Sequence, residues 1–399
     1  MNLDPLKILT LNSGSSSLKF AIYEHGTGGS GTDEGQILSG NVERIGGRGA
    51  SLEIKESTTS RRIKITAPNH VAAVQHIFKQ LDKIEAARDL AAIGHRIVMG
   101  GPKYSTPQRI SAALFRELHA LYRIDPLHMP AELKTIQAAE KFRPGLPQIA
   151  CFDTAFHRAM PRVAQIYALP RTLTQSLGIM RYGFHGLSYE YILSELRRVA
   201  PISARGKVII AHLGSGASMA AVHRGKCVDT TMGFSPTGGL MMGSRPGDLD
   251  PGVMVQLVTQ KKYGGTELNR LFYQESGLLG VSGLSSDMRD LTRTKVHHRE
   301  AQEALALFFY QARKALGALV AALGGVETLI FTAGIGEHSP LARAQISKGL
   351  AHLGLQLDPA KNARGDGEIS TRDSQVKVRV MKTNEELMIA RHTAKLLSR

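Results

Sequence analysis

The chain has 399 residues, two to three times the length of a typical domain of about 100 to 200 residues, so we expect two domains. Hydrophobic residues make up 42% of the chain and charged residues 21%, which excludes a disordered or collagen-like protein. Lys and Arg exceed Asp and Glu to give a net charge of +16, but the basic residues are scattered, and this pattern disfavours nucleic-acid binding.

The cysteine content and the N-terminal segment bear on the cellular compartment. Cys151 and Cys227 are too few and too far apart for a disulfide framework or a metal ribbon, so we expect both to pack in cores. Residues 1–10 lack a basic segment followed by an apolar one, and we recognise no apolar run near the roughly 20 residues that span a bilayer. We therefore expect a cytoplasmic protein without a membrane partner.

Two segments of similar pattern lie 200 residues apart. Residues 7–22 read KILTLNSGSSSLKFAI, and residues 207–222 read KVIIAHLGSGASMAAV. Each segment predicts a β-hairpin with a glycine-rich tip, because two apolar runs flank a stretch of small residues. Such tips present backbone N–H groups and hydroxyls, as two halves of one phosphate clamp would. Either segment taken alone is equally consistent with an ordinary hairpin turn.

Helical periodicity alternates with short apolar runs along the rest of the chain. The predicted helices cover residues 71–90, 112–123, 131–142, 301–323 and 383–397, and the predicted strands cover 92–98, 148–152 and 328–332. Pro130 suits the first turn of the third helix, and the spacing of Thr383 and Glu386 predicts a capping box for the last. The alternation predicts an α/β fold.

Ten segments, in order, resemble the acetate kinase family over the full length of the chain. They read LNSGSSSLKF at 11–20, GHRIVMGG at 94–101, DPLHMP at 125–130, FDTAFH at 152–157, RYGFHGLS at 181–188, AHLGSGAS at 211–218, TTMGFSPTGGLMMGSRPGDLDPG at 230–252, SGLSSDMRD at 282–290, FTAGIGEHS at 331–339 and TNEELMIAR at 383–391. Any one segment could arise by chance, so the order of all ten carries the resemblance.

The resemblance implies two duplicated RNase H-like domains of the actin-like ATPase, sugar kinase and Hsp70 superfamily, with an interdomain cleft. The N-terminal domain is expected at residues 1–154, with the C-terminal helix at 384–399 packed on it. The nucleotide-binding domain is expected at residues 155–383. The resemblance also suggests a homodimer.

The resemblance implies an ATP site and a metal site. The implied ATP-binding residues are Lys19, His212, Leu213, Gly214, Ser215, Gly216, Asp287, Met288, Arg289, Ala333, Gly334, Ile335, Gly336 and Glu337. Asn12 and Glu385 would hold Mg²⁺, or Mn²⁺ in its place; the capping box favours Glu385, since it assigns Glu386 to a backbone N–H. The chain has no GxxxxGK[ST] loop, which argues against a P-loop enzyme. Ser215 stands where the family usually has Asn.

The implied catalytic residues are Arg96, Asp153, His185 and Arg245. Phosphoryl transfer needs charge neutralisation and alignment, and arginine forks and histidines supply both. A carboxylate substrate is already ionised at neutral pH, so a general base has no proton to remove. We therefore expect Asp153 to orient an arginine or the hydrated metal ion.

The acceptor is expected to be a small acid. The resemblance places a substrate pocket at Arg96, Val98, Leu127, His128, Phe184 and Pro236. The sequence thus predicts reversible ATP- and Mg²⁺-dependent phosphorylation of acetate to acetyl phosphate by direct in-line transfer. A propionate or other short-chain carboxylate kinase stays open, because one methylene group changes discrimination by only about 1 to 3 kcal/mol. Two other classes also stay open: a nucleotide-gated binding protein of the actin or Hsp70 kind, and a nucleic-acid binder.

Overall fold

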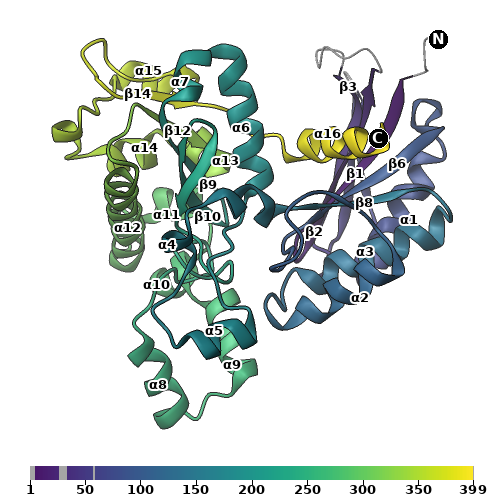
Figure 1. The fold of residues 1–399 in the computed structure, drawn as a ribbon, viewed down its shortest axis with the longest axis horizontal. Helices are drawn as coiled ribbons and strands as arrows, with labels where there is room; N and C mark the ends of the chain where they lie inside the picture. The colour runs from purple at the N-terminus through teal and green to yellow at the C-terminus, as the bar shows by residue number, and fades with distance from the viewer. Residues whose placement is uncertain (1–4, 27–33, 57–58, 399) are drawn as a thin grey trace. The chain divides into compact units, whose positions relative to one another are not determined.

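The computed structural model describes residues 5–26, 34–56 and 59–398, and they form two compact units (Figure 1). The first unit extends to Ala155 and also contains the C-terminal segment from Asn384, and the second unit is Phe156–Thr383. Each unit is described by itself.

The first unit is a mixed sheet with helices on both faces. Its elements are β1 Leu6–Ser13, β2 Ser17–His25, β3 Glu34–Glu43, β4 Ser51–Glu56, β5 Thr59–Lys64, α1 His70–Leu81, β6 Leu90–Ile97, β7 Gln108–Arg109, α2 Ala112–Ala120, α3 Met129–Phe142, β8 Gln148–Phe152 and α16 Glu385–Leu397. The strand order is β5-β4-β3-β2-β1-β6-β8-β7. Helices α1 and α3 pack on one face, and α16 packs on the other against β1, β2 and β6 (Figure 1).

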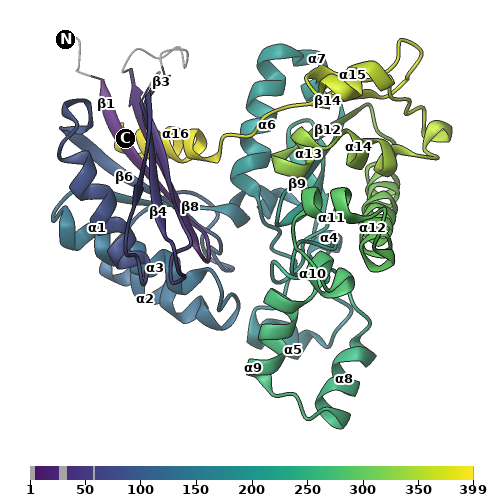
Figure 2. The same ribbon diagram turned by 180° about the vertical axis from the view of Figure 1, so that it is seen from behind.

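The second unit has a smaller mixed sheet. Its elements are α4 Arg162–Gln165, α5 Arg171–Leu177, α6 Gly186–Val199, α7 Pro201–Arg205, β9 Lys207–Leu213, β10 Ala217–His223, β11 Lys226–Thr230, α8 Pro251–Gln260, α9 Gly265–Arg270, α10 Gly277–Ser282, α11 Met288–Thr294, α12 Arg299–Leu323, β12 Thr328–Thr332, α13 Ala333–His338, α14 Pro340–Ser347, α15 Pro359–Arg364, β13 Gly367–Glu368 and β14 Lys377–Val380. The strand order is β11-β10-β9-β12-β14-β13. Helix α6 covers one face of this sheet and α12 the other, as both views show (Figures 1 and 2).

The two sheets share one strand arrangement. In the first unit the order β3-β2-β1-β6-β8 runs antiparallel up to β1 and parallel from β1 to β8. In the second unit β11-β10-β9-β12-β14 repeats the same pattern. The two similar sequence segments form the corresponding hairpins, β1-β2 and β9-β10. The predicted α/β fold with two duplicated sheets is confirmed.

Two predicted helix boundaries are wrong. The helix expected over residues 71–90 ends at Leu81, and Asp89 has a left-handed backbone with φ of 58° that turns the chain into β6. The alanine-rich residues between Leu81 and Asp89 favour a helix by propensity, but the chain from Leu90 onward pairs with β1 as strand β6. The capping box at Thr383 is also absent: Asn384 caps α16 and accepts a hydrogen bond from the Leu387 N–H.

One helix among the described residues, α12, is long and apolar enough by length and composition to cross a membrane. This apolar window was missed in the sequence, because charged residues interrupt it. Its buried face, which includes Phe308, Leu316 and Leu319, packs in the second unit, and the helix contacts β9, β10 and β11. Core helices of globular domains have the same character, so the finding is weak support for a membrane span.

Candidate active site

In the second unit, the side chains of Arg245 and His185 lie close to the glycine-rich tip of the β9-β10 hairpin. A Cβ atom built on Gly216 would lie 2.9 Å from Nη2 of Arg245 and 3.3 Å from Nε2 of His185. A Cβ atom on Gly214 would lie 3.7 Å from Cβ of Ala333 and 3.9 Å from Nε2 of His212. These predicted site residues therefore gather around one loop, although they come from four separate sequence segments.

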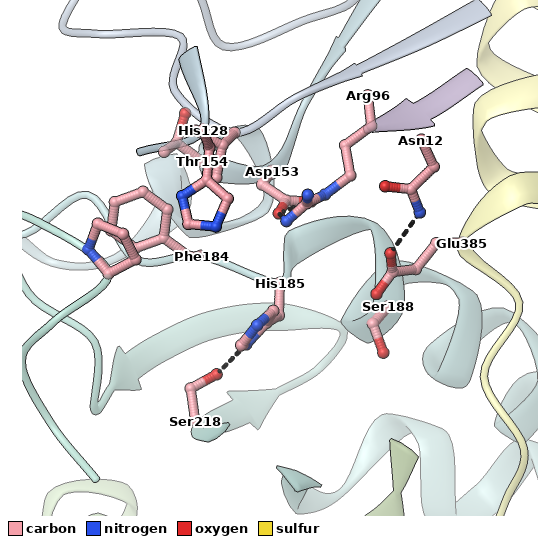
Figure 3. A network of polar contacts seen from close by, with 12 residues as sticks. Asn12, Arg96, His128, Asp153, Thr154, Phe184, His185, Ser188, Ser218 and Glu385 are labelled. Atoms are coloured by element: carbon pink, nitrogen blue, oxygen red, sulfur yellow. Dashed lines mark hydrogen bonds and ion pairs between the residues drawn. The ribbon is translucent and has the colours of Figure 1, made fainter. Parts of the chain in front are cut away.

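The imidazole rings of His185 and His212 stack face to face, with centroids 4.1 Å apart and planes 15° apart. Each ring is held through Nδ1 by a serine hydroxyl at 2.8 Å, Ser218 for His185 and Ser188 for His212 (Figure 3 shows the first). His185 has a left-handed backbone with φ of 60° just before α6, a conformation that costs a non-glycine residue energy and is found at functional sites. The sequence motifs contained Ser188 and Ser218 but gave no reason to select them.

The loop that carries Arg245 is fixed by backbone hydrogen bonds. The Met242 N–H donates to the Arg245 carbonyl at 2.9 Å, and the Arg245 guanidinium donates to the Pro236 carbonyl at 2.8 Å. Gly277 closes this arrangement, because a Cβ atom there would lie 2.2 Å from the Met242 carbonyl oxygen. The Ser215 carbonyl accepts a hydrogen bond from the Gly243 N–H at 3.0 Å, so the backbone of Ser215, rather than its exposed side chain, links the tip to this loop.

The segment expected to bind adenosine begins where β12 ends. Ala333 is left-handed, with φ of 65°, and Glu337 accepts a hydrogen bond from its N–H at 2.8 Å, so this carboxylate supports the backbone of α13. The fully buried Arg343 donates to the carbonyls of Gly336 and Glu337. Arg343 was not predicted, since no motif marks a buried arginine that binds helix carbonyls. Gly334 and Ile335 lie in the same short helix.

The second predicted nucleotide segment is the start of α11. Asp287 caps this helix by accepting from the Arg289 N–H at 2.7 Å, and the Arg289 guanidinium also donates to the Asp287 carboxylate. This hydrogen bond lowers the pKa of Asp287. Met288, which lies between these two residues in the chain, is buried. Leu213, the last residue of β9, is buried in the sheet.

In the first unit, the partly buried Arg96 and the fully buried Asp153 form an ion pair (Figure 3). Arg96 extends from β6, Asp153 follows β8 directly, and the Arg96 Nε donates to Oδ2 of Asp153 at 3.0 Å. Burial alone lowers the pKa of Arg96, but the carboxylates of Asp153, Glu385 and Glu132 raise it above its usual value. The expectation that Asp153 orients an arginine agrees with this contact.

Glu132, which the sequence did not single out, lies beside this pair. It extends from α3, is buried, and accepts the Val98 N–H with both carboxylate oxygens at 3.0 and 3.2 Å. Burial raises its pKa to about 8, although Arg96 and the Val98 N–H act in the opposite direction. Val98 has just left β6, so Glu132 replaces the strand partner that its N–H has lost. Only the position of Glu132 on the inner face of α3 could have suggested it.

The residues before α3 are held by Asp125, a second carboxylate that the sequence did not single out. It is fully buried and accepts from the N–H groups of Leu127 and His128 and from Nδ1 of His128 at 3.0 Å. Burial raises its pKa, but His128 and these hydrogen bonds lower it overall. The sequence offered one signal, an acidic residue three positions before a histidine.

The expected metal ligands also come together in the first unit. The Asn12 Nδ2 donates to Oε2 of Glu385 at 2.9 Å and to Oε1 of Glu386 at 3.1 Å (Figure 3 shows the first). Since Asn384 caps α16, the capping argument that separated Glu385 from Glu386 does not hold. The described residues contain no group of three or more His, Cys, Asp or Glu placed to hold a metal. An amide oxygen and two carboxylates are the hard oxygen donors that suit Mg²⁺, which commonly takes one or two protein carboxylates.

Some predicted relations stay predictions. Val98, Leu127 and His128 belong to the first unit, and Phe184 and Pro236 belong to the second, so their joint pocket is not tested. Lys19 lies in β2, where it pairs in register with Asn12, and its side chain is exposed.

Replacing Gly216 by Ala is expected to lower kcat by about 10²-fold, because a displacement of catalytic groups by about 1 Å has an effect of this size. The new methyl group would displace the Arg245 guanidinium, which is the end of a flexible side chain, so the fold should tolerate it. Steady-state kinetics with the substrates expected from the sequence, ATP and acetate, test this. Gly317→Ala in α12 is the control, since nothing beyond its chain neighbours and the backbone of its own helix lies within 4 Å of its new Cβ atom. Unchanged kcat in Gly216→Ala would contradict the arrangement.

As the pH rises from 5 to 8, the free energy of unfolding of Glu132→Gln is expected to increase relative to that of wild type. The folded pKa of about 8 exceeds the unfolded value of 4.5, so wild type loses stability throughout this interval, on the order of a few kcal/mol, while the glutamine does not titrate. Its amide oxygen can still accept from Val98. Urea unfolding of both proteins at pH 5.5 and 8.5 measures the difference, and a pH-independent difference would contradict the burial of Glu132 in its protonated form.

Two sheets of shared strand order, one with a glycine-rich hairpin faced by an arginine and two histidines, define a phosphotransferase of the actin-like ATPase fold. Residues 7–391 match the profile of the acetokinase family, and the chain belongs to this family. The chain is 45% identical to the acetate kinase of Rhodopseudomonas palustris and 40% identical to that of Dictyoglomus thermophilum, with at least 98% of both chains covered in each comparison.

Solved structures give the same result. The structure of Porphyromonas gingivalis acetate kinase matches with a TM-score of 0.86 at 35% identity, covering 98% of this chain and 100% of that one. A propionate kinase from Francisella tularensis matches with a TM-score of 0.89 at 33% identity, covering 97% and 98%. The resemblance inferred from the ten motifs is confirmed.

Proposed function

We propose that the chain catalyses the reversible transfer of the γ-phosphoryl group of ATP to acetate, forming acetyl phosphate and ADP. One observation carries this proposal: Arg245 and His185 converge on Gly216, at the tip of the hairpin expected to bind the ATP phosphates. The transition state of phosphoryl transfer spreads negative charge over three equatorial oxygens, which a guanidinium can neutralise while an imidazole N–H at the same point donates a hydrogen bond.

The proposed roles follow the two units. In the second unit, the backbone of Leu213–Gly216 and His212 bind the phosphates, and Ala333–Glu337 with Asp287–Arg289 enclose the nucleoside. In the first unit, Arg96 binds the acceptor carboxylate while Asp153 fixes its guanidinium. Lys19 contributes positive charge to the phosphates. These roles rest on the family and on the local geometry within each unit.

Mg²⁺, with Mn²⁺ as a substitute, would be held by Asn12 and Glu385, with Glu386 as a second available carboxylate. The ion would neutralise charge on the phosphate oxygens. A carboxylate oxygen attacks the γ-phosphorus directly, and no phosphoenzyme is needed, because the acceptor arrives ionised. Asp153, already paired with Arg96, therefore acts as a positioning residue rather than as a base.

The acceptor pocket is proposed to consist of Val98, Leu127, His128, Phe184 and Pro236. Acetate is favoured by the curated relatives, which are acetate kinases, whereas the propionate kinase among the structural relatives keeps propionate as the second candidate. A single methylene group allows only about 10- to 200-fold discrimination, so turnover of both acids is expected.

The decisive experiment traps acyl phosphate as hydroxamate in the presence of ATP and Mg²⁺ across formate, acetate, propionate and butyrate. The proposal requires hydroxamate from acetate. Higher kcat/KM with propionate would assign the chain to the second candidate. ATP hydrolysis that is independent of the acid, with no hydroxamate, would instead indicate a nucleotide-gated binding protein, and salt-sensitive retention on DNA that ATP does not relieve would indicate a nucleic-acid binder.

We also propose a cytoplasmic homodimer in which two copies pair through the surface formed by α5 and α8. Both views show α5, α8 and α9 grouped at one end of the second unit (Figures 1 and 2). No residue of α8 is buried, and its apolar residues Val253, Val255 and Val258 are all more than 40% exposed. Leu173 and Leu177 on α5 are exposed as well. Light scattering should give a molar mass twice that of the chain. The double variant Val255→Asp with Val258→Asp should reduce the measured mass to that of one chain.

A further inference from the structure

Nδ1 of His185 is hydrogen-bonded to the first of two linked, buried hydroxyl groups. Nδ1 lies 2.8 Å from Oγ of Ser218, and the same Oγ is hydrogen-bonded to the hydroxyl of Tyr189. Ser218 and Tyr189 are fully buried. Tyr189 lies one turn into α6, which begins immediately after His185, and Ser218 lies in β10, so two different elements hold the ring.

The chemistry of these groups gives the chain a direction. A phenol is a stronger hydrogen-bond donor and a weaker acceptor than an aliphatic alcohol, which favours Tyr189 as the donor and the Ser218 oxygen as the acceptor. Each hydroxyl has a single proton, and that of Ser218 is therefore directed to Nδ1 of His185. An imidazole nitrogen that accepts a proton donor is unprotonated, so the neutral ring carries its hydrogen on Nε2.

The other side of the ring supports a neutral state. Nε2 lies at the hairpin tip, and the Arg245 guanidinium approaches the same point. His212 stacks on the ring at 4.1 Å, and it is held in the same manner by Ser188, whose hydroxyl bonds to Thr383. A charged His185 would face the positive Arg245 guanidinium, an arrangement that like-charge repulsion disfavours.

We propose that Ser218 and Tyr189 are positioning residues that hold His185 as the neutral Nε2–H tautomer, so that it donates a hydrogen bond to a phosphoryl oxygen without carrying charge. This inference rests on the proposed function, since it concerns the histidine assigned to the transferring group. It differs from catalysis by an imidazolium, in which both nitrogens carry hydrogen and no tautomer has to be selected.

Long-range ¹H–¹⁵N correlation spectra of the full chain, labelled at its 15 histidines, test the tautomer without any assay of activity. His185→Gln identifies the signals of this ring. In wild type we expect a protonated Nε2 and an unprotonated Nδ1, and in Ser218→Ala a mixture of both tautomers. Tyr189→Phe retains the ring and removes only the outer donor, so it should give the same mixture with the packing intact.

Ser188→Ala is the matched control, because it removes the same group at the same distance from the neighbouring ring and should alter the His212 signals while leaving the His185 tautomer unchanged. An Nδ1–H tautomer or an imidazolium at His185 in wild type would overturn the inference, and so would an unchanged His185 pattern in Ser218→Ala.

Kinetics add a second readout. Ser218→Ala should lower kcat by about tenfold with little change in the KM for ATP, since one oriented hydrogen bond to the transferring group is weakened. A change in KM alone would contradict the role. Absence of acyl phosphate in wild type would reject the proposed function and would leave the tautomer result as an independent finding.

Discussion

Arg245→Ala is expected to reduce kcat by about 10³-fold, because an arginine that neutralises the transferring phosphoryl group contributes an effect of this size. Folding should be little affected. The Arg245 side chain donates to the Pro236 carbonyl at 2.8 Å, and the loss of this hydrogen bond costs about 1 kcal/mol. Hydroxamate formation at saturating ATP and acetate measures the effect, and the thermal midpoint checks the fold.

Two comparisons sharpen this experiment. Arg245→Lys retains the charge but not the planar fork, so it should recover only part of the activity. Arg299→Ala removes an exposed arginine from α12 that pairs with Glu303, and it should leave kcat unchanged. Near-wild-type turnover in Arg245→Ala would reject the assignment of this residue to the transferring group.

Arg96→Ala is expected to lower the free energy of unfolding by about 3 to 5 kcal/mol as well as to abolish turnover, because it leaves a buried carboxylate without its partner. Asp153 is fully buried, and Arg96 also faces Glu132 and Glu385. The chain contains no Trp, so urea unfolding is best followed by circular dichroism.

The double variant Arg96→Ala with Asp153→Ala should recover part of this loss, since it removes the unpaired charge. Arg198→Ala, which breaks an exposed pair with Glu195, should cost at most about 1 kcal/mol. Unfolding of Arg96→Ala at the same urea concentration as wild type would show that the buried pair contributes nothing. Of these two arginines, we therefore expect Arg245 to be the one whose replacement affects activity more than stability.

The sequence was sufficient for the fold wherever apolar runs and turns agreed. The strand predicted over residues 148–152 and the helix predicted over 301–323 lie within one or two residues of β8 and α12. Periodicity failed at residues 82–89, where helix-forming residues continue past the end of α1, because pairing of β6 with β1 outweighs local propensity. It also failed at Thr383, since Asn384 is an equally good cap one residue later.

The site divides in the same way. Charged residues in motifs, such as Arg96, Asp153 and Arg245, could be proposed from the sequence, because the family motifs contain them and phosphoryl transfer gives them a reason. The groups that hold them could not: Glu132, Ser218 and Tyr189 are buried residues of common types, and their partners lie 29 or more residues away. Only the fold brings such pairs together, so no spacing rule within one segment identifies them.

Helix α8, which has no buried residue, links the proposed homodimer to the thermal behaviour of the protein. If its apolar face is covered only in the proposed homodimer, dissociation and unfolding are linked by mass action. Dilution then lowers the thermal midpoint, and the first part of the chain to lose structure is the end of the second unit that contains α5, α8 and α9. For such a homodimer, stability depends on the protein concentration as well as on the sequence.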